Sequence, residues 1–314
     1  MKTNIKHLFL LPALIAVLNL IPAGRATAQT FTTLYSFSAT STNSSGDYTN
    51  SDGANPFAGL TPAGNGSPRY GTAANGGSGG VGTVFAVNAD GTGFTNLHSF
   101  TGGDGANPWA GLLLSGGTLY GTTLRGGSAG EGTVFAINTD GTGFTNLYQF
   151  TGGSDGSYPN GGLIIAGNTL YGTASHKGGS GSGTVFAINT DGTGFRILHN
   201  FTATVSNAYQ YYDPYYYYDY YYGYVGGYYD VYVNINGDGA VPVTGLILAG
   251  KTLYGTATLG GSGGNGTVFS VNTDGTGFTT VHSFELTQPI PPSTTYTGGG
   301  GNYYFCIGFC SIEY

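Results

Sequence analysis

The stretch 132–148 reads Gly-Thr-Val-Phe-Ala-Ile-Asn-Thr-Asp-Gly-Thr-Gly-Phe-Thr-Asn-Leu-Tyr, and its parts recur along a chain of 314 residues. Copies of Gly-Thr-Val-Phe begin at Gly82, Gly132, Gly183 and Gly266, and copies of Asp-Gly-Thr-Gly-Phe begin at Asp90, Asp140, Asp191 and Asp274. A third string, Leu-Tyr-Gly-Thr, begins at Leu119, Leu170 and Leu253. The chain therefore holds four repeats of about 50 residues, and the last interval carries an insertion of about 33 residues.

Each repeat divides into four short runs of strand-like composition. In the second repeat these runs are 110–114, 118–122, 133–138 and 144–150, and each has the length of an ordinary strand. Gly116 and Gly117 separate the first two runs, as a hairpin turn would. The pattern predicts four strands in every repeat.

The third run is apolar on both faces, because Phe135 and Ile137 alternate with Val134 and Ala136. A strand of this kind needs cover above and below, which a lone sheet lacks. Four-stranded units stacked around an axis supply that cover, and they repeat every 40 to 50 residues or so. We therefore predict an all-β fold, a β-propeller of four to five four-stranded blades, with a β-solenoid as the alternative. The glycine of Leu-Tyr-Gly-Thr is expected where backbones approach closely near the axis.

Composition favours a folded chain in spite of 60 glycines and 12 prolines. Only 7% of the residues are charged and 14% are aromatic, whereas disordered chains are rich in charge and poor in aromatic residues. The glycines also exclude a helical protein, because each costs a helix about 1 kcal/mol relative to alanine. The net charge of −7 repels phosphate backbones, so nucleic acid is not expected as a partner.

The two ends of the chain carry separate signals. Residues 1–28 have the lysines, the apolar run at 8–20 and the small-residue cleavage site of a signal peptide, and the run is too short to span a bilayer. We therefore expect export to the cell surface, the extracellular space or a bacterial periplasm. The repeat domain is predicted at 29–284, with a Tyr-rich insertion at 202–238 and a tail at 285–314. Because 31–37 matches a fourth run, we predict that it closes a degenerate fifth blade with the tail.

Neither metal nor cofactor is expected from the sequence. Cys306 and Cys310 could close a small disulfide loop, but without a nearby histidine they make half a zinc site. The Gly-rich stretches lack the lysine and the following helix of a phosphate loop.

The repeated text resembles the GloVer tandem-repeat family, exported bacterial proteins named from Gloeobacter and Verrucomicrobia. The residues that carry the resemblance are 132–148, the Asp-Gly loop and Leu-Tyr-Gly-Thr, and the match covers 31–201 and 236–284. The resemblance implies an exported repeat protein and brings no established enzymatic activity with it. Members often carry a C-terminal sorting signal, whereas residues 305–314 show no apolar helix followed by basic residues.

Two sets of aspartates are candidates for chemistry. Asp90, Asp140, Asp191 and Asp274 precede glycine between two runs, and the pattern predicts hairpin turns. Asp52, Asp104, Asp155 and Asp238 each precede glycine and lead into the first run. Equivalent loops of a propeller lie on one face, so these four could form an acidic rim that binds a cation or a polar ligand. Their alternative role is turn formation.

The remaining candidates are aromatic. His98, His199 and His282 align with Tyr35 and Tyr148, which indicates a half-exposed aromatic position, not a general base. The Tyr-rich insertion could stack on sugars, adhere to matrix or associate with itself, or it could be a low-complexity loop between blades.

These observations predict a non-enzymatic binding or structural module, with a glycan or extracellular matrix as its partner. The alternative is an extracellular enzyme that acts on polysaccharide through the rim. No catalytic residue is predicted, because no acid or base is set apart from the repeat.

Overall fold

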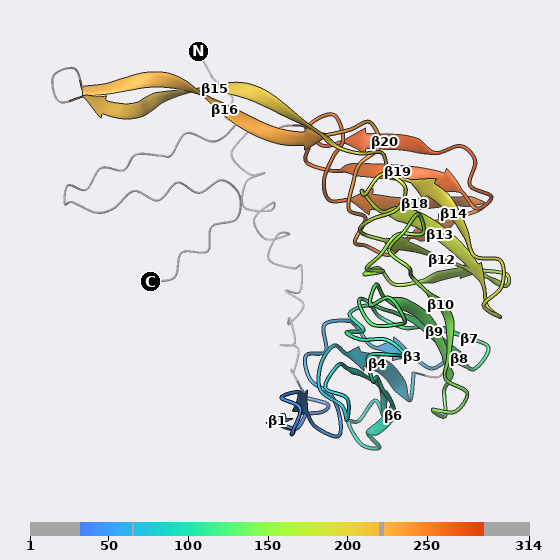
Figure 1. The fold of residues 1–314 in the computed structure, drawn as a ribbon. Coiled ribbons are helices and arrows are strands. Elements are labelled where there is room, and N and C mark those ends of the chain that lie inside the picture. Colours follow the sequence, from blue (N-terminus) through green and yellow to red (C-terminus); the bar gives the residue numbers. More distant parts are fainter. Residues whose placement is uncertain (1–31, 65, 220–222, 286–314) are drawn as a thin grey trace, which may run out of the picture. The chain divides into compact units, whose positions relative to one another are not determined.

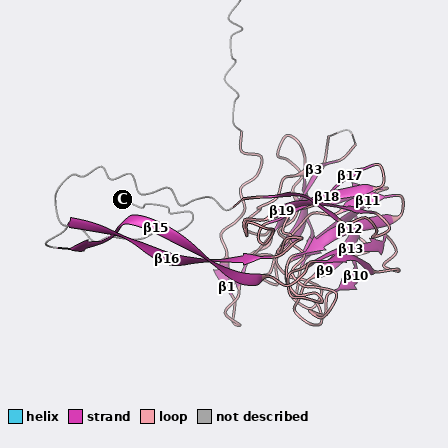
Figure 2. Cartoon of the chain, turned by 90° about the horizontal axis from the view of Figure 1, so that it is seen from above, coloured by secondary structure: helices cyan, strands magenta, loops and turns pink. Residues whose placement is uncertain are grey.

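The computed structural model describes residues 32–64, 66–219 and 223–285. Within these ranges every regular element is a β-strand (Figure 1, Figure 2), which confirms the all-β prediction. No helix in this part of the chain is long and apolar enough to cross a membrane. The predicted signal peptide and both cysteines lie outside the described residues.

Each repeat forms one antiparallel sheet of four strands. Sheet 1 contains β3 (Thr61–Pro62), β4 (Arg69–Ala73), β5 (Thr83–Val87) and β6 (Thr95–Ser99). Sheet 2 contains β7 (Leu113–Ser115), β8 (Thr118–Thr123), β9 (Thr133–Asn138) and β10 (Thr145–Gln149). Sheet 3 contains β11 (Ile164–Ala166), β12 (Thr169–Ala174), β13 (Thr184–Asn189) and β14 (Arg196–Asn200). Sheet 4 contains β17 (Ile247–Ala249), β18 (Thr252–Ala257), β19 (Thr267–Asn272) and β20 (Thr279–Ser283).

The strands of a sheet follow one another in chain order, and each pairs with its neighbour in the same repeat. This is the order of a propeller blade, whereas a solenoid pairs strands of successive coils. The predicted runs are therefore strands, although the first run is shorter than predicted. In the second repeat it begins at Leu113 and not at Ala110, because residues 110–112 do not pair with β8.

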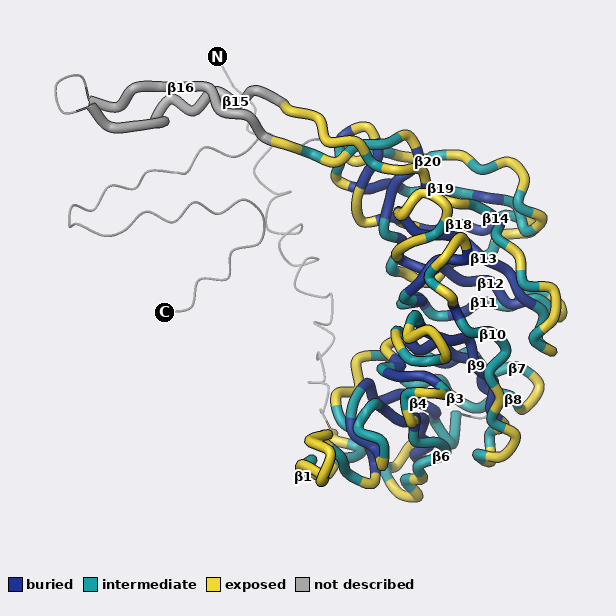
Figure 3. Tube along the Cα trace, viewed as in Figure 1, coloured by how far each residue is buried: buried dark blue, intermediate teal, exposed yellow. Residues whose placement is uncertain are grey.

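Consecutive sheets pack face to face and share their cores (Figure 3). The core between sheets 1 and 2 contains Tyr70, Val84, Ala86 and Phe100 from one sheet and Leu112, Leu119, Phe135 and Ile137 from the other. Cores of similar composition join sheet 2 to sheet 3 and sheet 3 to sheet 4. Because of this packing β9 is buried on both faces over its first five residues, as its sequence predicts.

Threonines of the second strands also join neighbouring sheets. Thr72 Oγ1 donates a hydrogen bond to Ala110 O at 3.0 Å, and Thr173 Oγ1 donates to Thr244 O at 3.0 Å. The threonine of Leu-Tyr-Gly-Thr thus links one blade to the loop that begins the next.

The glycine of the same string has a different role from the predicted one. A Cβ on Gly172 would lie 2.6 Å from Phe186 Cζ and 2.9 Å from Leu163 Cδ2. The equivalent Gly71 would meet Phe85 Cζ at 2.6 Å. The expectation of a backbone close to the axis is therefore wrong, because the space beside this glycine is filled by a phenylalanine ring from the adjacent strand.

The Asp-Gly-Thr-Gly segments form the predicted turns. In the second repeat Asp140 Oδ1 accepts hydrogen bonds from Thr142 N at 2.9 Å and Thr142 Oγ1 at 2.7 Å. Gly141 and Gly143 take φ values of 85° and 64°, which side chains other than glycine adopt rarely. The aspartate bonds its own turn, as expected.

The N-terminal segment packs on sheet 1 as a fourth run packs on the following sheet. The ring of Tyr35 stacks on Phe94 with a centroid distance of 3.8 Å, and Tyr148 stacks on Phe195 at 3.6 Å. This agrees with the predicted equivalence of 31–37 to a fourth run, although Phe31 itself is outside the described residues. The tail 286–314 is outside them too, so the fifth blade stays a prediction.

The insertion is a hairpin and not an irregular loop. β15 (Val205–Asp219) pairs with β16 (Gly223–Ile235) in antiparallel register, from Val205 opposite Ile235 to Asp219 opposite Gly223. Tyrosine favours strands, which explains the outcome. The register shifts between Asp213 and Tyr217, a stretch that includes Pro214, which has no N–H for the ladder. A second small sheet joins β1 (Ser41–Thr42) to β2 (Tyr48–Thr49).

Candidate functional site

The four predicted rim aspartates each join the end of one repeat to the start of the next. Asp155 accepts hydrogen bonds from Tyr148 Oη at 3.1 Å, Thr151 N at 2.7 Å and Thr151 Oγ1 at 2.7 Å. The same arrangement, which we call the interblade clamp, links Asp52 to Tyr35 and Ser38, Asp104 to His98 and Thr101, and Asp238 to His199 and Thr202.

The aromatic member of each clamp also stacks on the following sheet. The ring of His98 lies 3.8 Å from that of Phe144 with an interplanar angle of 6°, and His199 lies 3.5 Å from Phe278 at the same angle. Since a carboxylate only accepts hydrogen bonds, the Nε2 atoms of both histidines donate. A ring with a donor at its far end therefore fits this position, which explains why histidine and tyrosine alternate there.

The contacts in the clamp shift the pKa values of several of its members. Burial raises the pKa of Asp155, but hydrogen bonds from Thr151 and Tyr148 outweigh burial and hold the pKa below its ordinary value. Burial, together with the charge of Asp155, raises the pKa of Tyr148 to about 12. Burial lowers the pKa of His98, and the nearby charge of Asp104 opposes that effect only in part. The clamp at Asp155 thus joins a carboxylate to the neutral phenol of Tyr148.

Each of the four rim carboxylates is engaged in its own clamp, and in the described ranges no three His, Cys, Asp or Glu side chains lie close enough to hold a metal ion. A ligand rim made of Asp52, Asp104, Asp155 and Asp238 stays a prediction. The clamp itself has a sequence signal, Tyr or His, any residue, Phe, then Ser or Thr, at 35–38, 98–101, 148–151 and 199–202.

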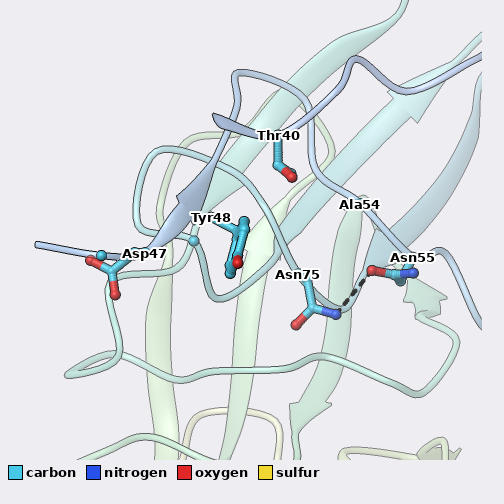
Figure 4. A pocket seen from close by; sticks show the side chains of 8 residues that line it. Thr40, Asp47, Tyr48, Ala54, Asn55 and Asn75 are labelled. Carbon is cyan, nitrogen blue, oxygen red and sulfur yellow. Dashed lines mark hydrogen bonds between the residues drawn. The ribbon is translucent and has the colours of Figure 1, made fainter. Parts of the chain in front are cut away.

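A pocket of about 500 Å³ lies beside the first repeat (Figure 4). Its wall includes Asp47 and Tyr48 from the β1–β2 hairpin, Asn55 from the loop between β2 and β3, and Asn75 from the loop after β4. The side chain of Tyr48 is 68% exposed. An exposed aromatic ring, two amides and a carboxylate therefore surround one hollow.

A polar strip leads from this pocket across the second and third repeats. It contains Asn55, Asn75, Asn107, Arg125, Tyr158 and His176, and each contacts the next directly or through paired backbone. Asn75 Nδ2 donates to Asn55 Oδ1 at 3.0 Å, and Asn107 Nδ2 donates to Asn75 Oδ1 at 3.1 Å. The residue before Asn107, Ala106, pairs with Arg125 through two backbone hydrogen bonds.

The far half of the strip is aromatic and basic. The Arg125 guanidinium carbon lies 5.6 Å from the centre of the Tyr158 ring, a cation–π contact, and the His176 ring meets Tyr158 edge to face at 5.5 Å. Tyr158 and its counterparts Asn55 and Asn107 take φ values of 56–58° before a proline. Asparagine tolerates this conformation better than tyrosine does, so the third repeat departs from the local preference.

Two exposed rings stand close to the strip in sequence. Phe57 lies two residues after Asn55, and Trp109 lies two residues after Asn107. The two side chains are 65% and 47% exposed. Their ring centroids lie 5.4 Å apart at an angle of 49°. This aromatic pair is an apolar surface shared by two repeats, and no sequence signal separates Phe57 and Trp109 from buried apolar residues.

The fold and the repeated junctions define an all-β repeat protein of the propeller type. The sequence pattern of the Gloeobacter/Verrucomicrobia repeat matches residues 23–225, and the chain belongs to this family. No curated protein matches the chain.

Solved structures resemble it at low sequence identity. A chain of the nidogen/laminin complex is 15% identical, with 69% of this chain and 75% of that chain covered and a TM-score of 0.34. A putative TolB from Agrobacterium tumefaciens is 10% identical over 70% of this chain and 63% of that chain, with a TM-score of 0.40. A gluconolactonase from Xanthomonas campestris is 11% identical over 72% and 75%, with a TM-score of 0.34.

Proposed function

We propose that the protein is an exported, non-enzymatic binding module whose ligand is a glycan. The observation that carries the proposal is the aromatic pair Phe57 and Trp109, which leaves two rings in solvent side by side. Flat aromatic rings stack on the apolar faces of sugars, and binding sites combine such rings with a few placed polar groups. The pocket and the polar strip supply the polar groups.

The amides of the strip suit sugar hydroxyls in particular. An amide side chain offers both donors and an acceptor, as a hydroxyl does. Asn55, Asn75 and Asn107 use only part of this capacity on one another, and the ring of Tyr48 adds a second exposed aromatic surface at the pocket. A linear glycan would contact the rings with its faces and the asparagines with its edges.

The alternative is an enzyme that acts on polysaccharide through the rim aspartates. Such an enzyme would have to take a carboxylate away from a clamp, because each rim aspartate already accepts hydrogen bonds from a ring and from a serine or threonine. We therefore favour binding without turnover.

Glycan binding is tested on an array with the wild type, Phe57→Ala, Trp109→Ala and the double variant. Phe284→Ala is the matched control, since Phe284 is 45% exposed and follows the last strand of sheet 4. We expect each site variant to weaken binding about tenfold, because a stacked aromatic ring contributes about 0.5–1.5 kcal/mol beyond its buried area. Equal binding by Trp109→Ala and Phe284→Ala would overturn the site. Depolymerisation that disappears in Asp155→Asn or Asp238→Asn, with the fold intact, would favour the enzyme.

We further propose that the insertion mediates self-association. β15 and β16 form a two-stranded sheet, and in the described part of the chain neither pairs with a third strand. A hairpin of this kind presents two unpaired edges, and an unpaired edge is a template for pairing with another chain.

A further inference from the structure

The third repeat differs from the other three where it meets the polar strip. Ser157 stands where the others have Ala54, Ala106 and Ala240, and Asn160 stands where they have Phe57, Trp109 and Val243. Lys177 replaces Gly76, Gly126 and Gly260 and keeps the positive φ, 57°, that favours glycine. A residue that differs from its equivalents in the other repeats, and that adopts a backbone conformation unfavourable for its type, points to a function at that position.

Basic groups gather at this repeat in a chain whose net charge is −7. Arg125 lies over Tyr158, His176 touches the same ring, and Lys177 follows His176. Two carboxylates lie nearby, but Glu131 pairs with Lys177 and Asp155 is held in its clamp. Arg125 has no acidic partner within the described residues, so its guanidinium fork is free to bind an anion.

The same place holds buried polar atoms without partners. The described residues contain five buried side-chain oxygens without a hydrogen-bond partner, and three of them are Glu131 Oε2, Ser157 Oγ and Asn160 Oδ1. Ser157 is fully buried. Buried polar atoms in native proteins are usually hydrogen-bonded, so these three atoms set the third repeat and its border with the second apart from the rest of the described chain.

We propose that Arg125, Tyr158 and His176 form a subsite for the carboxylate-bearing sugar of an acidic glycan. The inference rests on the proposed glycan function and adds a ligand class to it. The carboxylate accepts hydrogen bonds from the guanidinium of Arg125, and the sugar ring packs beside Tyr158. The strip then carries the chain of the glycan from this subsite to Asn107, Asn75 and the pocket at Tyr48.

The test compares polygalacturonate with dextran, an uncharged polysaccharide, by calorimetry on the full chain. The variants are Arg125→Gln, Trp109→Ala and Lys251→Gln, and the last removes one positive charge from the exposed turn between β17 and β18. Arg125→Gln is expected to weaken polygalacturonate about tenfold or more, because a bidentate guanidinium–carboxylate pair is lost, and to change dextran less than about twofold. Lys251→Gln is expected to leave both unchanged within about twofold.

The outcomes separate this inference from the proposed function. If Trp109→Ala weakens both glycans and Arg125→Gln weakens polygalacturonate alone, both stand. If wild-type protein binds dextran in a Trp109-dependent way and does not prefer polygalacturonate, the acidic subsite is wrong and glycan binding stands. If Arg125→Gln and Lys251→Gln weaken polygalacturonate equally, long-range charge explains the preference and the subsite is wrong. If neither glycan binds, the acidic subsite is wrong, and the array decides the proposed function.

Discussion

Phe201 and Phe284 occupy the same position of successive repeats, yet Phe201 is fully buried and Phe284 is 45% exposed. Phe201 lies between sheets 3 and 4, where its ring centroid is 5.1 Å from that of Phe269. Phe284 follows β20 at the edge of the last described sheet. The phenylalanine at this position therefore stabilises the fold by packing against the following sheet and not by contacts within its own sheet.

Substitution of these two residues by alanine separates the contribution of packing between sheets from the contribution of the residue within its own sheet. Phe201→Ala is expected to lower the free energy of unfolding by about 3–5 kcal/mol, since it leaves a cavity between two sheets. Phe284→Ala should cost less than about 1 kcal/mol. Urea unfolding of both variants measures the difference, and similar losses would contradict the assignment of the core to the junctions.

The clamp at Asp155 predicts that the free energy of unfolding falls at both ends of the pH scale. The pKa of Asp155 is below its ordinary value of 3.8 in the folded state, so its contribution is present above that pH and is lost as the pH falls. The pKa of Tyr148 is raised from 10.0 to about 12, so its contribution is complete below pH 10 and is lost as the pH rises through 12. Unfolding midpoints between pH 2 and pH 12 or so measure both limbs.

Variants of the clamp distinguish its two members. Tyr148→Phe should flatten the alkaline limb and keep the acid limb contributed by the other carboxylates, and Asp155→Asn should reduce both limbs. Tyr232→Phe, at a tyrosine that is 67% exposed on β16, controls for the loss of one phenol. An alkaline limb in Tyr148→Phe as steep as in the wild type would show that another group titrates there.

Gly172 is predicted to tolerate no side chain. Gly172→Ala would place a Cβ 2.6 Å from Phe186 Cζ, and we expect it to lower the free energy of unfolding by about 1–3 kcal/mol through overpacking. Gly103→Ala is the control, because nothing lies within 4 Å of its Cβ position. Equal stability of the two variants would mean that the ring of Phe186 can move aside.

The sequence predicts the sheets well because the apolar pattern of one repeat already requires a neighbour on each face. Phe135 and Val134 lie on opposite faces of one strand and could not both be buried in a lone sheet, so stacking follows from the apolar pattern. The clamp was harder to predict. Tyr148 and Asp155 are close in sequence, but Tyr35 and Asp52 or His199 and Asp238 are not, and only the folded junction gives them one geometry.

The candidate site was the least predictable part. Phe57 and Trp109 are ordinary apolar residues in the sequence, and only the structure leaves them exposed beside each other. The strip depends on contacts between residues of different repeats, such as Arg125 and Tyr158, which no periodicity of a single repeat contains.

Val241 offers a stabilising substitution. It is a β-branched residue at φ 58°, where Asn55 and Asn107 stand in the first two repeats. Val241→Asn should raise the free energy of unfolding by about 1 kcal/mol, because asparagine adopts this conformation with less strain. Val241→Ala removes the same apolar side chain without that preference, and a midpoint for Val241→Asn no higher than for Val241→Ala would refute the prediction.

The Tyr-rich hairpin can be removed to test self-association. We expect deletion of 209–232 to lower the mass measured by light scattering and to leave the unfolding midpoint nearly unchanged, because the base of the hairpin is held by Asp238 with His199 and Thr202. Sedimentation velocity at several concentrations gives an independent measure. An unchanged mass would count against association through this hairpin.

The interblade clamp also makes each junction a natural point of insertion. Thr101 and Asp104 are three residues apart, whereas Thr202 and Asp238 are joined by the same hydrogen bond across 36 residues. The clamp thus closes the base of whatever segment lies between its members, at a place where the length of that segment hardly affects the sheets. Foreign peptides inserted between Thr101 and Asp104 or between Thr151 and Asp155 should be displayed on a framework that still folds. Each blade of the family repeat would then offer one site for the display of an inserted peptide.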